Sequence, residues 1–433
     1  MHRIKQFGKF SIILLFFAIM GITAYAQQTD ALGTYTPYSL FGIGEIEKQG
    51  TSYNKGMGGI GIGVRDIRYI NYLNPASITA RDTLSFMMDF GINQKNFYNT
   101  DGNISSAFNT ANMQNVMLTS PIKDKAAFII GITPYSNIGY SFRENETNPE
   151  IVAKYGDIAY EKYGTGSINQ FFIGAATNIG GHFSIGAEMM YYFGTLTRNS
   201  NVEFVTDYTM RDIRTGWDYS VNAISGRIGA QYYNTFGKLE FAAGATYRFA
   251  GNLDGDYTRF ATAVAGSQID TIKMEATAGY KVEIPAEIGL GFSLRKHDKW
   301  LLGVDYVGQN RKGSHFGDAA GDMFKAVNSS SFRAGLEFIP NKYDIRYYFK
   351  RVSYRFGAYY DKTYLNIGGN QVNAAGFTFG MSMPINKWYN AITWSVDMGQ
   401  RGALENNMVK ERYVQLNFNL NLHDIWFVKR KYN

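Results

Sequence analysis

Ten charged residues in this 433-residue chain fall in stretches where large apolar residues alternate with small or polar ones. They are Asp89, Glu188, Arg227, Glu240, Arg248, Asp305, Arg333, Glu337, Arg355 and Asp397. Each belongs to the small-residue set, and successive residues of a strand point to opposite faces. Because both signs of charge are present, the chemistry that this pattern favours is ion pairing along a shared polar surface.

Catalytic and metal chemistry have less support. The five histidines are His2, His182, His297, His315 and His423, and only His315 lies in a predicted long loop, beside Ser314 and near Asp318. A hydrolase holds its nucleophile, base and orienting carboxylate rigidly, and nothing in the sequence fixes these three. Asn252, Asp254 and Asp256 could offer oxygen ligands to a cation, although acidic loop residues are usually just solvated. We expect no enzyme activity, catalytic residue, metal or cofactor.

The stretch from 285 to 307 shows the elements that position such charges. Ile288, Leu290, Phe292 and Leu294 alternate with Gly289, Gly291 and Ser293, and Trp300, Leu302, Val304 and Tyr306 alternate with Gly303 and Asp305. A charged turn at 296–299 separates the two runs, so they predict an antiparallel hairpin with one apolar and one small or polar face.

The same alternation recurs along the chain and predicts about 14 strands, an even number, as a barrel with both ends on one side requires. Their centres lie near 84–92, 113–122, 126–141, 166–178, 183–194, 224–233, 239–249, 288–294, 300–306, 332–338, 354–360, 377–383, 392–398 and 414–422. Short connections near 123–125, 179–182, 234–238, 296–299 and 385–390 alternate with long ones near 96–112, 143–163, 199–217, 251–276, 310–330 and 401–411. Short turns on one side and long loops on the other are typical of outer-membrane barrels.

A soluble sandwich is the alternative, with its apolar face inward. Only 18% of the residues are charged, below the usual quarter for soluble domains, and 16% are aromatic. Mean hydropathy is nevertheless −0.24, as expected when every second residue of a span faces a lumen. An Arg or Lys facing lipid at mid-bilayer costs about 2–4 kcal/mol, so the ten charges fix which face points inward. The fold class predicted is all-β, a transmembrane antiparallel barrel of about 14 strands spanning 83–424.

The amino terminus predicts export. A basic stretch precedes the apolar run 12–22, and Ala24-Tyr25-Ala26 resembles a cleavage site, so residues 1–26 are predicted to be a signal peptide. A transmembrane anchor is the alternative, but the run is short for one. The chain lacks cysteine, its net charge is +7 and its pI is about 9.1. Apart from the basic tail 425–433 the charges are dispersed, so we expect no nucleic-acid partner; basic residues could pair with anionic outer-membrane lipids.

Residues 27–82 are predicted to form a compact segment ahead of the barrel. Glycine is dense there, which allows close backbone packing and free turning, and the apolar content is too high for a disordered leader. Further along, Pro134 interrupts a strand beside Gly131 and Tyr135. Because proline donates no ladder hydrogen bond, that strand must bulge, kink or lose a neighbour.

These motifs together resemble the FadL-like family of outer-membrane transporters of long-chain fatty acids. The resemblance rests on a glycine-rich run followed by Asp66 and Asn-Pro-Ala ahead of the first strand, and on the interrupted third strand. It extends to Ile284-Pro285 with the strand that follows, and to Trp426-Phe427-Val428-Lys429-Arg430-Lys431, which is similar to the Bacteroidota branch. The residues that it implicates in a plug, or hatch, are Gly58, Gly59, Gly61, Gly63, Asp66, Asn74, Pro75 and Ala76.

The resemblance implies passive uptake of a hydrophobic compound, such as a fatty acid, past a moving plug and out sideways beside the kinked strand at Gly131, Pro134 and Tyr135. The family's ligand-pocket residues have no match in this chain, and the lumen face derived above is polar and ionic. A second hypothesis is therefore a structural or accessory barrel in the outer membrane of a Gram-negative bacterium, with a sealed lumen and other outer-membrane proteins as partners. An apolar pocket would favour the first, and a sealed lumen the second.

Overall fold

The computed structural model describes residues 32–81, 85–123, 125–206, 209–311, 324–385, 390–405 and 408–425. The predicted signal peptide, the loop that carries His315, and the tail beyond residue 425 lie outside these ranges. Residues 33–433 belong to one compact unit. No helix in the described ranges is long and apolar enough to cross a membrane.

Strands dominate the described residues, and the few helices are short. The elements in order are η1 (Pro37–Leu40), β1 (Glu45–Ile46), α2 (Ser52–Lys55), η2 (Pro75–Thr79), β2 (Ser85–Thr100), β3 (Ser105–Lys123), β4 (Ala126–Asn145), α3 (Pro149–Tyr155), β5 (Ile158–Ile179), β6 (Phe183–Phe204), β7 (Asp212–Phe236), β8 (Leu239–Arg248), β9 (Gly251–Ala265), β10 (Gln268–Ile284), β11 (Glu287–Lys296), β12 (Trp300–Gln309), β13 (Phe324–Ala326), β14 (Ser329–Phe338), η4 (Tyr348–Lys350), β15 (Ser353–Ile367), β16 (Asn370–Pro384), β17 (Ala391–Arg401) and β18 (Lys410–Ile425).

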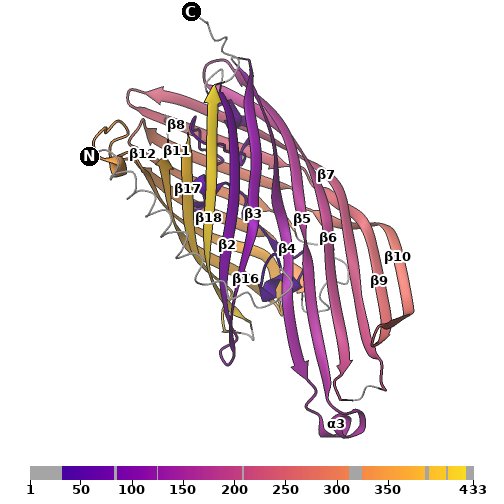
Figure 1. Ribbon diagram of the computed structural model, residues 1–433. Helices are drawn as coiled ribbons and strands as arrows, with labels where there is room; N and C mark the ends of the chain where they lie inside the picture. Colours follow the sequence, from indigo (N-terminus) through magenta and orange to yellow (C-terminus); the bar gives the residue numbers. More distant parts are fainter. Residues whose placement is uncertain are drawn as a thin grey trace, which may run out of the picture. The chain divides into compact units, whose positions relative to one another are not determined.

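The strands form a closed antiparallel barrel (Figure 1). Each wall strand pairs with its neighbours in the sequence, and β18 closes the ring by pairing with β2 from Ile425↔Ser85 to Lys410↔Thr100. Both ends of the wall therefore lie at one rim, here called the near rim, and the opposite rim is the far rim. Closure leaves the wall no open edge within the membrane, which a sheet in lipid requires.

Fourteen wall strands make up this ring, as the sequence predicts. β7 pairs with β8 near one rim and with β9 near the other, so β8 and β9 follow one another along a single wall strand. β10 and β11 do the same, because they pair with β9 and β8 respectively. With β1 and β13 set aside, the 18 strands of the sheet thus form a ring of 14.

Side-chain exposure follows the predicted alternation. On β11, Leu290 and Phe292 are 51% and 46% exposed, and Val304 on β12, the partner of Phe292, is 53% exposed. Between them lie buried positions such as Ser293 and Asp305. The large apolar side chains thus cover the outside of the barrel, where they meet lipid, and the small and charged ones point inward.

The far rim differs from the sequence expectation. The predicted long loops at 96–112 and 251–276 are wrong: β2 and β3 continue to a turn at 101–104, and β9 and β10 to a turn at 266–267. Beyond the membrane both faces of a strand can meet water, so the apolar alternation that marks a strand is lost there.

Candidate functional site

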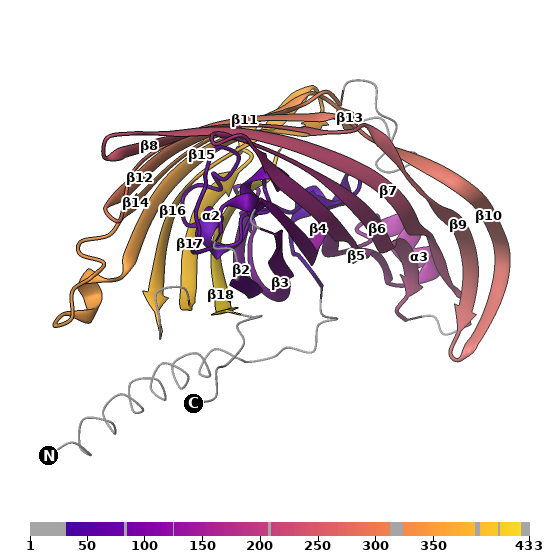
Figure 2. The same ribbon diagram turned by 90° about the horizontal axis from the view of Figure 1, so that it is seen from above.

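The interior of the barrel contains the chain's own amino-terminal part. We call residues 33–81 the inner segment; Figure 2 shows it inside the ring, in indigo, with α2 labelled. Most of its residues are buried, and Met57, Ile60, Val64 and Ile70 are fully so. Its helices contact opposite parts of the wall, since α2 lies against β16–β18 and η2 against β4–β7. The inner segment therefore crosses the lumen.

The Asn-Pro-Ala motif begins η2. The Asn74 side chain accepts a hydrogen bond from the Ala76 amide (3.0 Å) and caps the helix, while Pro75 occupies the first turn, where its missing N–H costs nothing. The Asn74 amide also donates to the carbonyls of Ile62 (3.0 Å) and Ala230 on β7 (3.1 Å). The motif thus joins the glycine run to the wall.

The glycine run approaches the wall backbone closely. Gly58 has a positive φ of 70°, and a Cβ there would lie 2.7 Å from the carbonyl oxygens of Ala334 and Ala358. The amides of Gly61 and Ile62 both donate to Oδ2 of Asp305, at 2.6 and 2.8 Å. Glycine is required at Gly58 both for its backbone conformation and for this contact.

Asp66 lies in a buried ionic cluster that joins the inner segment to three wall strands. Its carboxylate pairs with Arg68 (2.6 Å) and with Arg295 of β11 (2.7 Å). Arg68 also pairs with Glu337 of β14, and Glu337 pairs with Arg355 of β15 (2.8 Å), which is fully buried. Burial alone would raise the pKa of Asp66, but Arg295 and Arg68 hold it well below its usual value.

A second set of ion pairs involves the segment around β1. Glu45 pairs with Arg401 of β17 (2.6 Å) and with Lys95 of β2, and Lys48 lies 3.2 Å from Asp397 of β17. Burial would raise the pKa of Glu45, but Lys95 and Arg401 lower it well below its usual value. The strand pattern in the sequence does not mark Glu45, Lys48 or Arg68. Charged residues in a segment rich in glycine and apolar side chains are nevertheless a signal for partners on the wall.

The structure places nine of the ten predicted lumen residues inside the barrel with different partners. Glu188 pairs with Arg227 (2.9 Å), Arg248 with Glu287 (3.1 Å) and Glu337 with Arg355. Asp305, Arg333 and Asp397 contact the inner segment. Asp89 is held by amides, those of Asn115 and Asn419, rather than by a cation. Glu240 is the exception: its side chain is 39% exposed and lies 3.2 Å from His297 near a turn.

The third wall strand, β4, departs from its neighbour at the predicted kink. β3 and β4 pair from Lys123↔Ala126 only as far as Val116↔Ile132. The register with β5, on the other side, shifts between Pro134 and Ser136. Towards the far rim the two strands therefore separate, because the remainder of β3 pairs with β2 alone.

The inner segment occupies the edge that β3 leaves free. β1 pairs with β4 through Glu45↔Asn137 and Ile46↔Ser136. Nearby, Asn112 on β3 donates to the carbonyl of Gly33 (2.7 Å). The segment thus contacts both strands and stands in the ladder position that β3 would otherwise fill.

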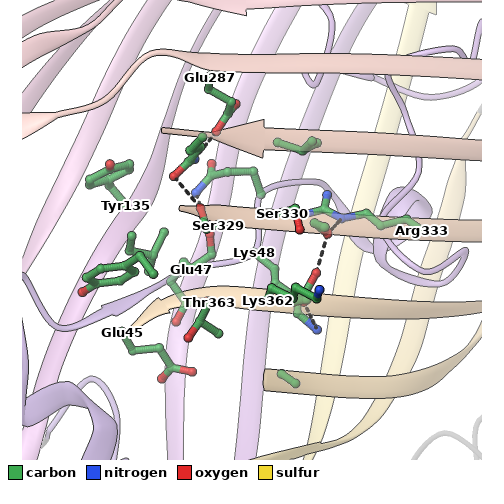
Figure 3. Close-up of a pocket in the computed structure, with 18 of the residues that line it drawn as sticks. Glu45, Glu47, Lys48, Tyr135, Glu287, Ser329, Ser330, Arg333, Lys362 and Thr363 are labelled. Carbon is green, nitrogen blue, oxygen red and sulfur yellow. Dashed lines mark hydrogen bonds and ion pairs between the residues drawn. The ribbon is translucent and has the colours of Figure 1, made fainter. Parts of the chain in front are cut away.

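A pocket of about 210 Å³ lies beside β1, and its lining mixes charged and polar side chains with apolar ones such as Ile62 and Met190 (Figure 3). Figure 3 shows Glu45, Lys48 and Arg333 around it, with Glu287 above. Ligand pockets usually measure about 300–1,000 Å³ and are mostly apolar. A second hollow of about 360 Å³ is lined in part by Arg198 and Trp217, and other apolar side chains of the wall and inner segment pack into a core that includes Ile43 and Phe172.

A family model named BamG matches residues 4–433. The chain belongs to the BamG family. Among curated proteins none matches this BamG-family chain.

Several solved structures share the fold. The toluene transporter TbuX of Ralstonia pickettii superposes with a TM-score of 0.58 at 14% identity, covering 86% of this chain and 98% of its own. The P. putida toluene transporter TodX gives 0.56 at 14% identity, with 88% and 100% covered. A FadL homologue of Pseudomonas aeruginosa gives 0.55 at 12% identity, with 88% and 99% covered. At these identities the likeness shows the FadL-like barrel fold and no more.

Proposed function

We propose that this BamG-family barrel is a closed accessory subunit of a protein assembly in the outer membrane of a Gram-negative bacterium. The observation that carries the proposal is the ionic fastening of the inner segment: Asp66, Glu45 and Lys48 are each paired with charges on the wall. Breaking a buried ion pair costs about 3–5 kcal/mol. Several such pairs favour a permanent seal over a plug that moves with each solute.

The chain's layout supports the same role. Residues 1–26 are the predicted export signal, the described residues 33–81 fill the lumen, and the wall strands between Ser85 and Ile425 cross the membrane. The near rim, with its short turns, faces the periplasm, and the far rim faces outward. Anionic lipids surround the barrel, and other outer-membrane proteins are its partners.

Two measurements on the purified full-length protein test this function. Reconstituted into planar bilayers, the barrel is expected to pass no ions. Extracted in mild detergent from the bacterium that makes it, the tagged chain is expected to bring down the same outer-membrane proteins in stoichiometric amounts. A barrel that purifies alone and conducts ions would contradict the proposal.

Transport of a hydrophobic compound is the second candidate, and one observation favours it. β3 and β4 separate beyond Ile132, so withdrawal of β1 would leave a sideways exit into the membrane. TbuX and TodX are described as toluene transporters, and long-chain fatty acids are a further substrate class. Liposomes carrying the protein should then take up labelled fatty acid or toluene faster than empty ones, and equal rates would remove this candidate.

A further inference from the structure

The barrel wall is much taller on one side than on the other. β5, β6 and β7 have 22, 22 and 25 residues, whereas β12 and β14 have 10 each. About 9–11 residues suffice to cross the hydrocarbon. The strands from β4 to β10 therefore continue past the membrane at the far rim, and Figure 1 shows β9 and β10 projecting there at the lower right.

β10 forms one border of this extension. Its pairing partner among the described residues is β9, from Gln268↔Ala265 to Ile284↔Gly251. The strand that would continue the wall on its other side is β12, but β12 ends at Gln309, opposite Glu287 of β11. Except for Asp270, every residue of β10 from Gln268 to Gly279 is exposed. Among the described residues, β10 thus presents one edge of its backbone to solvent from Gln268 to Gly279.

We propose that the open edge of β10 binds an extended segment of a different polypeptide, which adds to the sheet as a further strand. The inference rests on the proposed function and deepens it by naming the surface and the kind of partner. An open edge presents a row of backbone N–H and C=O groups, and an added strand satisfies them in alternation.

The side chains of β10 support a protein partner rather than lipid. Ile269, Ile272 and Met274 are 62%, 63% and 67% exposed although they lie beyond the span needed to cross the membrane. Apolar side chains grouped at an aqueous edge mark an interaction surface. Lys273 and Glu275, on either side of Met274, discourage unspecific pairing, as charges on natural edge strands do.

Geometry excludes a second copy of this chain as the added strand. Strands of a membrane barrel tilt about 35–45° from the membrane normal. Two copies in one membrane are related by a rotation about that normal, so two facing β10 strands would tilt in opposite directions. They would cross at about 70–90° and could not form a ladder. The partner strand must come from a chain of different shape.

Cross-linking from the edge tests this inference, and the absence of cysteine in the chain makes each introduced thiol unique. The test uses two β10 variants, Met274→Cys and Ala276→Cys. The matched control is Phe260→Cys on β9, whose residue is the Cα partner of Met274. Each variant is labelled with a photoreactive cross-linker in the producing bacterium. We expect both β10 positions to attach to one polypeptide, at sites two residues apart, and the β9 position not to do so.

Proline variants supply the second arm. Ile272 and Ala278 have no Cα partner on β9, so Ile272→Pro and Ala278→Pro disturb the open edge with little effect on the existing ladder. We expect these two proline variants to lower recovery of the cross-linked polypeptide at least about tenfold. The control Ser267→Pro, in the turn between β9 and β10, should leave recovery unchanged. Both variants should keep the gel mobility of a folded barrel.

Every other outcome contradicts the inference. The inference is overturned if the cross-linker attaches only to lipid, to a second copy of the chain or to residues 312–323 of the same chain. It is also overturned if the attachment site on the partner does not shift by two residues between the Met274 and Ala276 variants. Unchanged recovery of the partner with the proline variants would overturn it as well. If the partner co-purifies but β10 attaches to nothing, this inference fails and the proposed function stands. If no protein co-purifies, both fail.

Discussion

Lys55 in α2 shows how closely the inner segment is enclosed. Its side chain is buried, and its ammonium nitrogen lies 3.5 Å from Oδ1 of Asn417 on β18. Burial lowers the pKa of Lys55 to about 8, against the weaker opposing effects of Glu47 and Asp397. The buried ammonium therefore destabilises the folded barrel at neutral pH.

Replacing Lys55 by methionine is expected to stabilise the barrel at pH 7 by about 3 kcal/mol, since each unit of pKa shift corresponds to about 1.4 kcal/mol. Below pH 8 the lysine is protonated in both states, and the destabilisation is fully present. Between pH 8 and about 10.5 the folded state loses the proton and the unfolded state keeps it, so the free energy of unfolding of the native protein rises. Urea unfolding in detergent at pH 7 and 10, followed by tryptophan fluorescence, measures both effects.

The control for this change is Lys281→Met, because that lysine is 63% exposed. Its effect on the free energy of unfolding should be small, because water already solvates the charge. A Lys55→Met variant whose advantage over the native protein were the same at pH 7 and pH 10 would show that its ammonium is not buried as described.

The Glu337 carboxylate gives a second prediction at the residue scale. Glu337→Gln removes the charge that balances Arg355 and Arg68 in the interior. Loss of one partner of a buried ion pair costs about 3–5 kcal/mol. Glu275→Gln, whose side chain is 55% exposed in a pair with Lys273, should cost far less, because water screens an exposed ion pair. Equal losses, measured by urea unfolding, would be inconsistent with the cluster.

Residue patterns in the sequence anticipate the wall charges but not their partners. Asp305 and Glu337 are recognisable as inward-facing because large apolar residues alternate with small or polar ones along their strands. Arg68 and Lys48 lie in a segment without period, where nothing local indicates which wall residue each will face. Their pairing depends on how the inner segment folds within the closed ring, which is a long-range property.

Among the elements, β1 decides between the two candidate functions. Ile46 and Ser136 are Cα partners in an antiparallel pair, so their Cα atoms lie about 4.5–5.5 Å apart, within the range that a disulfide bridges. The double variant Ile46→Cys, Ser136→Cys is expected to oxidise readily and to lock β1 against β4. For a closed accessory subunit, partner recovery should be the same with and without reductant.

The single variant Ile46→Cys is the control, since it cannot form the bridge within one chain. If liposome uptake of a labelled hydrophobic compound ceased on oxidation of the double variant and returned on reduction, β1 would be a moving gate. That result would replace the accessory role by transport.

Element boundaries mark the limit of the sequence pattern. The membrane portions of β11 and β12 are evident from period two, because lipid on one face and water on the other impose it. β9 and β10 lie outside the membrane, so a stretch such as 251–276 resembles a loop although it is a hairpin. The break between β8 and β9, beyond Arg248, is likewise set by pairing with β7 and not by any local signal.

The described wall is a ring whose interior holds residues 33–81 of the same chain, and the wall alone would enclose a polar channel. Inward-facing residues such as Asp89, Arg227 and Asp397 would then meet water rather than the inner segment. A 14-strand ring lies between small barrels filled by side chains and the 16–18-strand porins that leave an aqueous channel. The seal therefore depends on residues 33–81.

Deletion of residues 33–80, with residues 1–32 kept for export, is expected to convert a silent barrel into an ion-conducting one. The wall retains its closed hydrogen-bonded ring and apolar outer face, so it can still insert, while loss of the inner segment opens the lumen. Single-channel recording in planar bilayers should show discrete steps for the deletion and none for the intact chain. Heat-dependent gel mobility shows whether the shortened barrel is folded. A double variant, Asp66→Asn with Asp305→Asn, keeps the inner segment but weakens its attachment to the wall. This variant should conduct ions intermittently. A folded deletion that passes no ions would show that the wall itself closes the lumen.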